Sequence, residues 1–315
     1  MRVLYLGNFS QSHCTETHLA REMVGLGHEV LCYQEPPGGG DHSTIVDLER
    51  SAEGHDLVMF TRTWGLPSEA TDLWRRLEDR GIATASYHLD LYRGLQRASK
   101  VDGDPFWTTG IVFTPDGDPE SAKWFHRHGI NHVYSPPAVV SDECVPGNYR
   151  AELDHDVVFV GSKHYHPEWR HRPALLQWLA DTYGPRFKRY GGDAQVMRGQ
   201  DLNDLYASAK VVVGDSLCLP GHTNYWSDRY YETVGRGGFL IAPAVPGIEK
   251  HFTDDLHLAF YDFWDFDGLK ATIDHYLADE FTRHRIQHRG QAHVAESHTY
   301  RHRLAEALSH IGAAV

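Results

Sequence analysis

Residues 225–242, YWSDRYYETVGRGGFLIA, decide the fold, because they predict a short helix that ends at glycines and turns directly into a strand. Ser227 can accept a backbone N–H bond at the start of that helix. The glycines of the GRGG run can end it, since glycine adopts left-handed caps and tight turns without steric cost. Residues 239–242 form a short apolar run, which is typical of a buried parallel strand.

The same helix carries the charged side chains that suggest a binding site. Asp228, Glu232 and Gly235 stand at i, i+4 and i+7, so they share one face, with Arg229 and Arg236 on a neighbouring face. A carboxylate and an arginine on a short helix before a glycine turn can hold a ribose and a diphosphate. The spacing alone leaves open a second interpretation, a solvated helix with an internal ion pair.

Strands and helices alternate along the chain in two cycles, which predicts an α/β protein with two doubly wound domains. The first cycle has predicted strands at residues 2–6, 29–33, 56–61, 82–87, 111–114 and near 133. The second has predicted strands at residues 156–160, 187–190, 210–214, 239–242 and 253–261, then helices at 268–277 and 287–312. Residues 135–149 are rich in proline and show little periodicity, so we predict a linker there, with a hinge near Pro136 and Pro137.

Composition narrows the class of protein. The formal net charge is −13, and such an acidic excess disfavours sequence-independent binding to DNA or to an anionic membrane. The four cysteines form no C-x-x-C pair and the N-terminus lacks a signal-peptide pattern, so we expect a cytoplasmic protein. No apolar stretch approaches the ~18 residues of a membrane span. The first strand–helix–strand unit lacks G-x-G-x-x-G, which argues against a nicotinamide-dependent dehydrogenase.

Metal binding is not expected from the sequence. Histidine occurs 23 times, but none of the His-x-His pairs is joined by a carboxylate or cysteine at a zinc-site spacing. D-x-D letters occur at residues 102–104 and 116–118, in glycine turns whose composition explains them. We therefore expect arginine and a helix dipole, rather than an obligatory metal, to stabilise a leaving diphosphate.

The pattern D-R-x-x-E-x-x-x-x-G-G-F-L-I at residues 228–241 resembles the donor-site helix of GT-B glycosyltransferases. More narrowly, it is similar to group 1 glycosyltransferases related to spore-maturation protein B, including actinobacterial and actinophage members. The likeness continues through PGIE at 246–249 and ends in HTYRHR at 298–303. It implies a GT-B fold, with two Rossmann-like domains facing across a cleft and a C-terminal helix that crosses back to the first domain.

The resemblance also implies a division of labour between domains. Residues 1–140 would form the acceptor-side domain, residues 150–290 the nucleotide-sugar donor domain, and residues 291–315 the helix that returns to the first domain. In this family the glutamate of the helix binds the donor ribose, which carries over to Glu232. Arg229 is assigned to the diphosphate, since a fork-shaped cation matches phosphate oxygens.

Three strand-end loops complete the predicted donor site, beginning at Gly161, at Tyr190 and at Ser216; the third, residues 216–226, carries Asn224 and Tyr225. Gly161-Ser162 would let the backbone approach a phosphate, with Arg170 or Arg172 supplying charge; a plain strand-end turn with surface arginines is the alternative. Tyr190-Gly191 ends a strand where the family places the donor base. The predicted donor-binding residues are Gly161, Ser162, Arg170, Arg172, Tyr190, Gly191, Asn224, Tyr225, Asp228, Arg229 and Glu232.

The first domain should hold the acceptor and any general base. His88 and Asp90 follow a predicted strand, at the sheet edge where open α/β folds bind ligands, so with Arg229 they are the candidate catalytic residues. The alternative is that Asp90 caps a helix and His88 packs in the core.

The function expected is transfer of a hexose from a nucleoside diphosphate sugar, UDP favoured over GDP, with retention of configuration. No cofactor is expected beside this co-substrate. The acceptor stays open between a phage or bacterial protein, a small molecule and a modified DNA base. A nucleotide-sugar 2-epimerase of the same fold and a catalytically idle sugar-nucleotide-binding protein are the alternatives.

Overall fold

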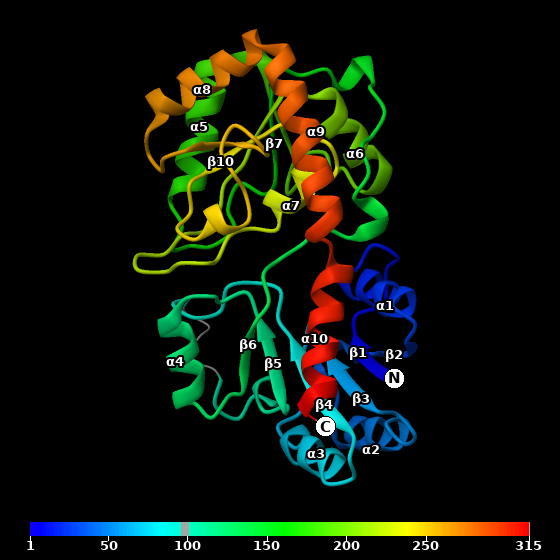
Figure 1. Ribbon diagram of the computed structural model, residues 1–315. Helices are drawn as coiled ribbons and strands as arrows, with labels where there is room; N and C mark the ends of the chain where they lie inside the picture. Colours follow the sequence, from blue (N-terminus) through cyan, green and yellow to red (C-terminus); the bar gives the residue numbers. More distant parts are fainter. Residues whose placement is uncertain (96–100, 315) are drawn as a thin grey trace. The chain divides into compact units, whose positions relative to one another are not determined.

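The chain folds into two α/β units, each built on its own parallel sheet (Figure 1). A computed structural model describes residues 1–95 and 101–314. One unit comprises residues 1–136 together with the last helix, α10 (Tyr300–Ala314), and the other comprises residues 137–299. The chain therefore passes between units at Pro136–Pro137 and again at Thr299–Tyr300.

The first unit has a six-stranded sheet in the order β2-β1-β3-β4-β5-β6. Its strands are β1 (Arg2–Gly7), β2 (Glu29–Gln34), β3 (Leu57–Phe60), β4 (Ala83–Tyr87), β5 (Ile111–Thr114) and β6 (His132–Tyr134). The helices α2 (His42–Ser51), α3 (Ala70–Glu78) and α4 (Pro119–Arg127) share one core with the sheet. The chain adds β2 on one side of β1 and all later strands on the other side. Because the crossovers are right-handed, α1 (Thr15–Gly25) lies on the face opposite to α2, α3 and α4, and α10 packs against it there.

The second unit has a five-stranded sheet in the order β11-β10-β9-β7-β8. Its strands are β7 (Val157–Val160), β8 (Phe187–Tyr190), β9 (Val211–Val213), β10 (Leu240–Pro243) and β11 (Ala259–Tyr261). One face is covered by α5 (His171–Tyr183) and α8 (Phe266–Ala278), and the other by α6 (Gly199–Ser208), α7 (Arg229–Gly235) and α9 (Glu280–Ser297) (Figure 1). The predicted fold class, an α/β protein with two parallel-sheet Rossmann-like domains, is confirmed.

Two glycines explain how α7 fits between its neighbours. A Cβ at Gly235 would lie 2.9 Å from Val294 of α9 and 3.0 Å from the sulfur of Cys144, so the absent side chain permits close helix packing. Gly237 has a φ of +85°, which lets the chain leave the helix and enter β10. The short helix is thus held tightly, with its charged first turn facing the carboxyl edge of the sheet.

Residues 135–149 differ most from their predicted role as a linker. Val139 and Cys144 are buried in the core of the second unit, and Glu143 pairs with Arg236 of the turn after α7. The backbone at Gly147 approaches that of Asn203 so closely that a Cβ would lie 2.1 Å from its carbonyl carbon. The low hydrophobic periodicity of residues 135–149 therefore reflects irregular backbone, and most of this segment packs as part of the second unit.

Two further boundaries are corrected. The C-terminal helix predicted to return at residue 291 is two helices, because α9 stays with the second unit and only α10 belongs to the first. A break at His298, with φ −133°, and a β-bridge between Val139 and Thr299 separate them. The strand predicted at 253–261 shortens to β11, because residues before it form turns.

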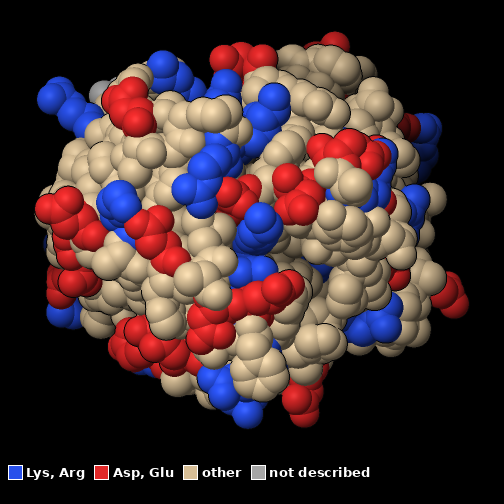
Figure 2. Space-filling view, turned by 90° about the horizontal axis from the view of Figure 1, so that it is seen from above, with Lys and Arg blue, Asp and Glu red and all other residues tan. Residues whose placement is uncertain are grey.

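Acidic and basic side chains are interspersed over the face drawn in Figure 2. Within residues 1–95 and 101–314, no helix is both long and apolar enough to cross a membrane.

Candidate functional site

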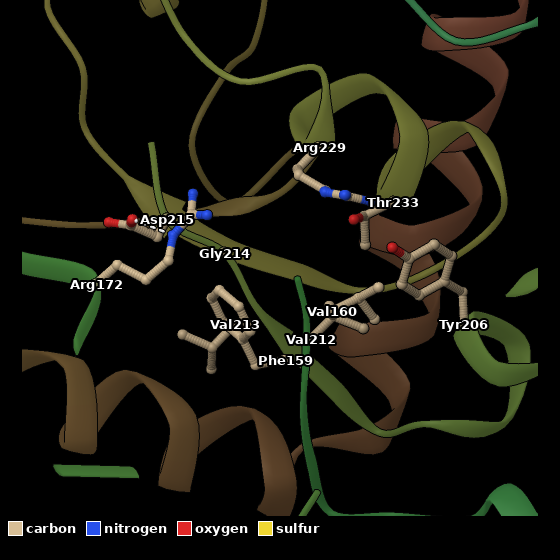
Figure 3. A pocket seen from close by; sticks show the side chains of 10 residues that line it. All are labelled: Phe159, Val160, Arg172, Tyr206, Val212, Val213, Gly214, Asp215, Arg229 and Thr233. Carbon is tan, nitrogen blue, oxygen red and sulfur yellow. Dashed lines mark hydrogen bonds and ion pairs between the residues drawn. The ribbon is translucent and has the colours of Figure 1, made fainter. Parts of the chain in front are cut away.

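A pocket opens at the carboxyl edge of the second sheet, where β7 and β9 end (Figure 3). Its floor is formed by the ends of those strands, including Val160 and Gly214, and its cavity volume is only about 20 Å³, roughly the space of one or two water molecules. Arg172 of α5 lines one side, and Arg229 of α7 lines the other with Thr233 beside it. Two arginines from different helices thus line one small pocket, with the guanidinium of Arg172 beside Asp215 and that of Arg229 pointing toward Thr233 and Tyr206 (Figure 3).

Arg229 is held by its own helix. Its Nη1 donates to Oε2 of Glu232 at 2.9 Å, an i,i+3 pair whose side chains are 35% and 23% exposed. Burial works to lower the pKa of Arg229, but the carboxylates of Glu232 and Asp228 outweigh it and raise that pKa, so the guanidinium stays charged. Burial and Asp228 raise the pKa of Glu232, while Arg229 and Arg236 oppose the shift.

Arg172 is held by a buried carboxylate that comes directly after β9. Its Nε donates to Oδ2 of Asp215 at 2.9 Å, and its guanidinium lies 5.0 Å from the ring centre of Tyr165. Asp215 is 2% exposed and also accepts from Trp169 Nε1 at 2.9 Å and from His171 Nδ1 at 2.7 Å. One carboxylate therefore accepts hydrogen bonds from three side chains at the N-terminal end of α5.

The structure distinguishes the two arginines between which the sequence could not choose. Arg172 is 7% exposed and lines the pocket, whereas Arg170 is exposed at the N-cap of α5. The phosphate-binding assignment of either residue remains a prediction.

The loops after β7 and β8 lie against each other. Gly161 donates its N–H to the carbonyl of Tyr190 at 2.8 Å, and a Cβ at Gly191 would be 3.2 Å from the Gly161 nitrogen. A side chain at Gly192 would meet Ser162 at 2.9 Å. The glycines predicted at this edge therefore keep two strand-end loops in contact.

The phenol of Tyr190 serves a different place. Its oxygen lies 2.8 Å from His155 Nε2, in a separate polar pocket that Lys188 and Asp201 also line. Among the described residues, Tyr190 does not line the pocket that Arg172 and Arg229 share.

The predicted polar pair before α7 is part of a loop contact. Asn224 has a φ of +55°, donates its N–H to Pro246 at 2.8 Å and accepts from Lys250 at 3.2 Å. Tyr225 is 6% exposed. Asp228 is the N-cap of α7 and accepts from Ser227 Oγ at 3.0 Å. Neither Asn224 nor Tyr225 is among the described residues that line the pocket.

In the first unit, His88 follows β4 and is half-buried among aromatic rings. The ring centres of Tyr92, Phe106 and Trp107 lie 5.6, 5.7 and 5.6 Å from that of its imidazole. Asp90 lies two residues further on and is also half-buried. The packing role that the sequence left open for His88 is thus visible, and a catalytic role for either residue remains a prediction.

The D-x-D carboxylates hold loops. Asp104 caps the short 3-10 helix Pro105–Trp107 and pairs with Arg62. Asp118 caps α4 through the N–H of Ser121 at 2.9 Å and pairs with Arg93 at 2.9 Å. Among the residues that the structure describes, no group of three or more His, Cys, Asp or Glu side chains could hold a metal ion.

Sequence reasoning missed Asp215, Tyr206 and Thr233. Asp215 carried a usable signal, since it comes after the apolar run at 210–214, at a strand's carboxyl end. Tyr206 and Thr233 lie inside helices and reach the pocket only through packing of α6 and α7 against the sheet. Burial raises the pKa of the Tyr206 phenol, so its hydroxyl is protonated beside Arg229.

One family model matches part of the sequence. Residues 166–309, which include the pocket helices α5 and α7, match the family described as glycosyl transferase-like. No curated protein matches the sequence.

Solved structures match nearly the whole chain at low identity. Sucrose-phosphate synthase from Thermosynechococcus elongatus is 12% identical with a TM-score of 0.64, covering 100% of both chains. HepE from Anabaena in complex with UDP is 12% identical with a TM-score of 0.65, covering 98% of this chain and 100% of its own. A putative UDP-N-acetylglucosamine 2-epimerase from Listeria monocytogenes is 10% identical with a TM-score of 0.52, covering 94% of each chain. The protein therefore has the GT-B fold, and residues 166–309 are similar to the glycosyl transferase-like family.

Proposed function

We propose that the protein is a glycosyltransferase that takes a hexose from a nucleoside diphosphate sugar and uses UDP in preference to GDP. The observation that carries the proposal is the pair Arg172 and Arg229, which line one pocket from two helices, with Glu232 beside Arg229. The match of residues 166–309 to a glycosyl transferase-like family supports it. Anabaena HepE, which shares the fold, has been solved with UDP and with UDP-glucose.

The two arginines suit a diphosphate. A guanidinium binds phosphate oxygens through parallel N–H bonds, and its charge persists at any physiological pH. When the glycosidic bond to the diphosphate breaks, negative charge grows on the leaving oxygen. Fixed cations at that place stabilise the transition state without reorganising, which is commonly the largest contribution to catalysis.

Glu232 is assigned to the donor ribose. A carboxylate accepts hydrogen bonds only, so it suits two vicinal hydroxyl groups. Its present partner is Arg229, and a bound nucleotide would place phosphate near that guanidinium and ribose near the carboxylate. We expect the pair to divide between these two ligand groups when a donor binds.

We further propose that transfer retains the configuration of the sugar. We also propose that the protein belongs to the glycosyltransferases related to spore-maturation protein B. The departing diphosphate would itself assist removal of the acceptor proton, which makes charge on the diphosphate more important than any single base. His88 and Asp90 would then orient the acceptor. The acidic net charge of −13 favours a protein or small molecule over duplex DNA as the acceptor, and a cytoplasmic location is proposed with it.

A screen of nucleotide sugars, read by mass spectrometry, tests the proposal. Hydrolysis of a donor, or transfer of its sugar to a candidate acceptor, is the expected result. Isomerised sugar nucleotide without an acceptor would instead identify a 2-epimerase. Tight binding of a donor with no turnover in any mixture would identify an idle binding protein.

A further inference from the structure

A cluster of polar side chains meets at the wall of the pocket, and the proposed chemistry uses only its arginine, Arg172. Its centre is Asp215, which receives hydrogen bonds from Trp169, His171 and Arg172. We infer that Asp215 is a positioning residue, which fixes Arg172 so that its terminal nitrogens face the donor diphosphate. This inference rests on the proposed function and assigns the orientation of one of its two cations.

The position of the hydrogen bond between Asp215 and Arg172 determines which guanidinium nitrogens remain for a ligand. The contact is made by Nε, at the base of the guanidinium, at 2.9 Å. The terminal nitrogens form the part of the fork that binds phosphate in two parallel bonds. Holding the fork by Nε therefore orients it and still leaves its ligand-binding end for the pocket that Arg172 lines.

Aromatic rings restrict the same guanidinium. Its central carbon lies 5.0 Å from the ring centre of Tyr165 and 5.8 Å from that of Phe159. An arginine fixed in this way loses less side-chain entropy when a ligand binds, so more of the interaction appears as affinity.

The carboxylate itself is fixed by two other donors. His171 is fully buried and binds Oδ1, while Trp169 shares Oδ2 with Arg172. Because a carboxylate only accepts, Nδ1 of His171 carries the hydrogen. The imidazole is enclosed by aromatic rings, with Phe263 and Trp264 both at 5.0 Å between ring centres. Asp215 thus has little freedom to rotate away from Arg172.

Arg229 provides the contrast. One of its terminal nitrogens, Nη1, already binds Glu232, so part of its fork is engaged before a ligand arrives. Arg172 is engaged at Nε instead. The two arginines therefore differ. The hydrogen bond to Asp215 leaves the terminal nitrogens of Arg172 for a ligand, whereas one terminal nitrogen of Arg229 is bound to Glu232, the carboxylate assigned to the ribose.

A double-mutant cycle on the full chain tests the inference, with UDP as the ligand and calorimetry as the readout. Asp215→Asn keeps the shape of the side chain but removes its charge and one of its two acceptor oxygens, so Arg172 is held less firmly. We expect UDP to bind about tenfold more weakly or worse, the scale of a charge-assisted hydrogen bond. In an Arg172→Ala background, Asp215→Asn should change UDP affinity less than about twofold, because little coupling remains between a residue and a partner that is gone.

Two results would overturn the inference. One is unchanged UDP affinity in Asp215→Asn, and the other is an equal loss in both backgrounds, since either shows that Asp215 does not act through Arg172. Failure of the proposed donor site looks different, because the unaltered protein would then bind no UDP, which would overturn both the donor site and this inference. Binding of UDP without sugar transfer would overturn the proposed activity alone.

Arg172→Lys decides the matter if Asp215→Asn does not fold, as judged by circular dichroism. Lysine keeps the charge but cannot bind Asp215 through Nε while presenting a fork to the ligand. We expect the UDP affinity of Arg172→Lys to fall to within about threefold of that of Arg172→Ala, because lysine keeps the charge but loses the fixed orientation toward the phosphate. Affinity equal to that of the unaltered protein would mean that charge alone suffices, and would contradict the positioning role.

Discussion

The carboxyl edges of the two sheets use buried carboxylates in different ways. In the first unit, Glu35 accepts the backbone N–H groups of Thr63 at 2.8 Å and Gly65 at 2.6 Å, and Asp116 accepts those of Tyr92 and Arg93. These bonds tie loops to the sheet. Asp118, buried at the same edge, does bind the guanidinium of Arg93, but Arg93 lies in the loop that Asp116 already holds, so this ion pair also fixes a loop.

In the second unit, Asp215 and Glu232 accept from side chains, and the side chains they hold include the two arginines of the pocket. Backbone donors carry no net charge, so carboxylates that bind them fix the shape of a loop. Carboxylates that bind guanidinium groups fix the position of a cation. The same fold thus provides a rigid edge in one unit and a charged binding site in the other, and each prediction below tests that difference.

The largest effect is expected at Arg229. Replacing it by alanine should lower turnover about 100-fold or more, the cost of deleting one preorganised donor at a developing negative charge. Initial rates of donor hydrolysis or transfer, followed by mass spectrometry, give the measurement. Arg198→Ala, at an exposed arginine before α6, is the matched control and should retain its rate. A fully active Arg229→Ala would remove the cation from the mechanism.

Glu232 should affect binding more than chemistry. Glu232→Ala should weaken UDP binding by about 1.5–3 kcal/mol, the range for a hydrogen bond to a charged group. Calorimetry with UDP measures the loss. Glu232→Gln keeps the shape and one acceptor, so it should lie between alanine and the unaltered protein. Equal UDP affinity for all three proteins would contradict the ribose assignment.

Asp116 should make the stability of the first unit depend on pH. Burial raises its pKa to about 7, against backbone hydrogen bonds that lower it. A carboxyl whose folded pKa is raised stabilises the fold while protonated, and that contribution is lost as pH rises through the folded value. Between pH 6 and pH 8 the loss should be about 1.4 kcal/mol, one pKa unit of free energy.

Denaturant unfolding of the full chain at pH 6 and pH 8 measures this loss, and Asp116→Asn is the control. Asparagine has the same shape and does not titrate, so the variant should show a smaller fall in stability over that interval. Parallel pH profiles for the two proteins would show that Asp116 is ionised throughout.

The smallest effect is expected at His88. His88→Phe preserves a ring among Tyr92, Phe106 and Trp107 but removes both nitrogens. We expect turnover to change less than about threefold, because a retaining reaction assisted by the diphosphate needs no imidazole base. A general base contributes roughly 10²–10⁴-fold, so a loss of that size would establish His88 as the base and favour inversion.

Much of the fold could be predicted because its pattern is local. Apolar runs and glycine turns predicted β5 and β8 at their observed ends, and most other predicted elements within two residues. Residues 135–149 could not be predicted as part of the core, because their burial depends on α6 and the turn after α7, which lie more than 50 residues away. Irregular backbone gives no periodic signal even when it is packed.

The candidate site divides along the same line. Arg229 and Glu232 lie three residues apart on one helix, so their spacing was enough to suggest a pair, and the structure has that pair at 2.9 Å. Asp215 and Arg172 are 43 residues apart, and only the adjacency of β7 and β9 in the sheet brings them together.

The sequence by itself determined the alternation of strands and helices, the glycine turn after α7, and the charged residues of that helix, because all of these depend on neighbours within a few positions. The tertiary structure decided which arginine after β7 lines the pocket, which carboxylate holds it, and where the chain returns to the first unit. Those outcomes depend on strand order and on side chains packed from distant segments, and no local pattern encodes either.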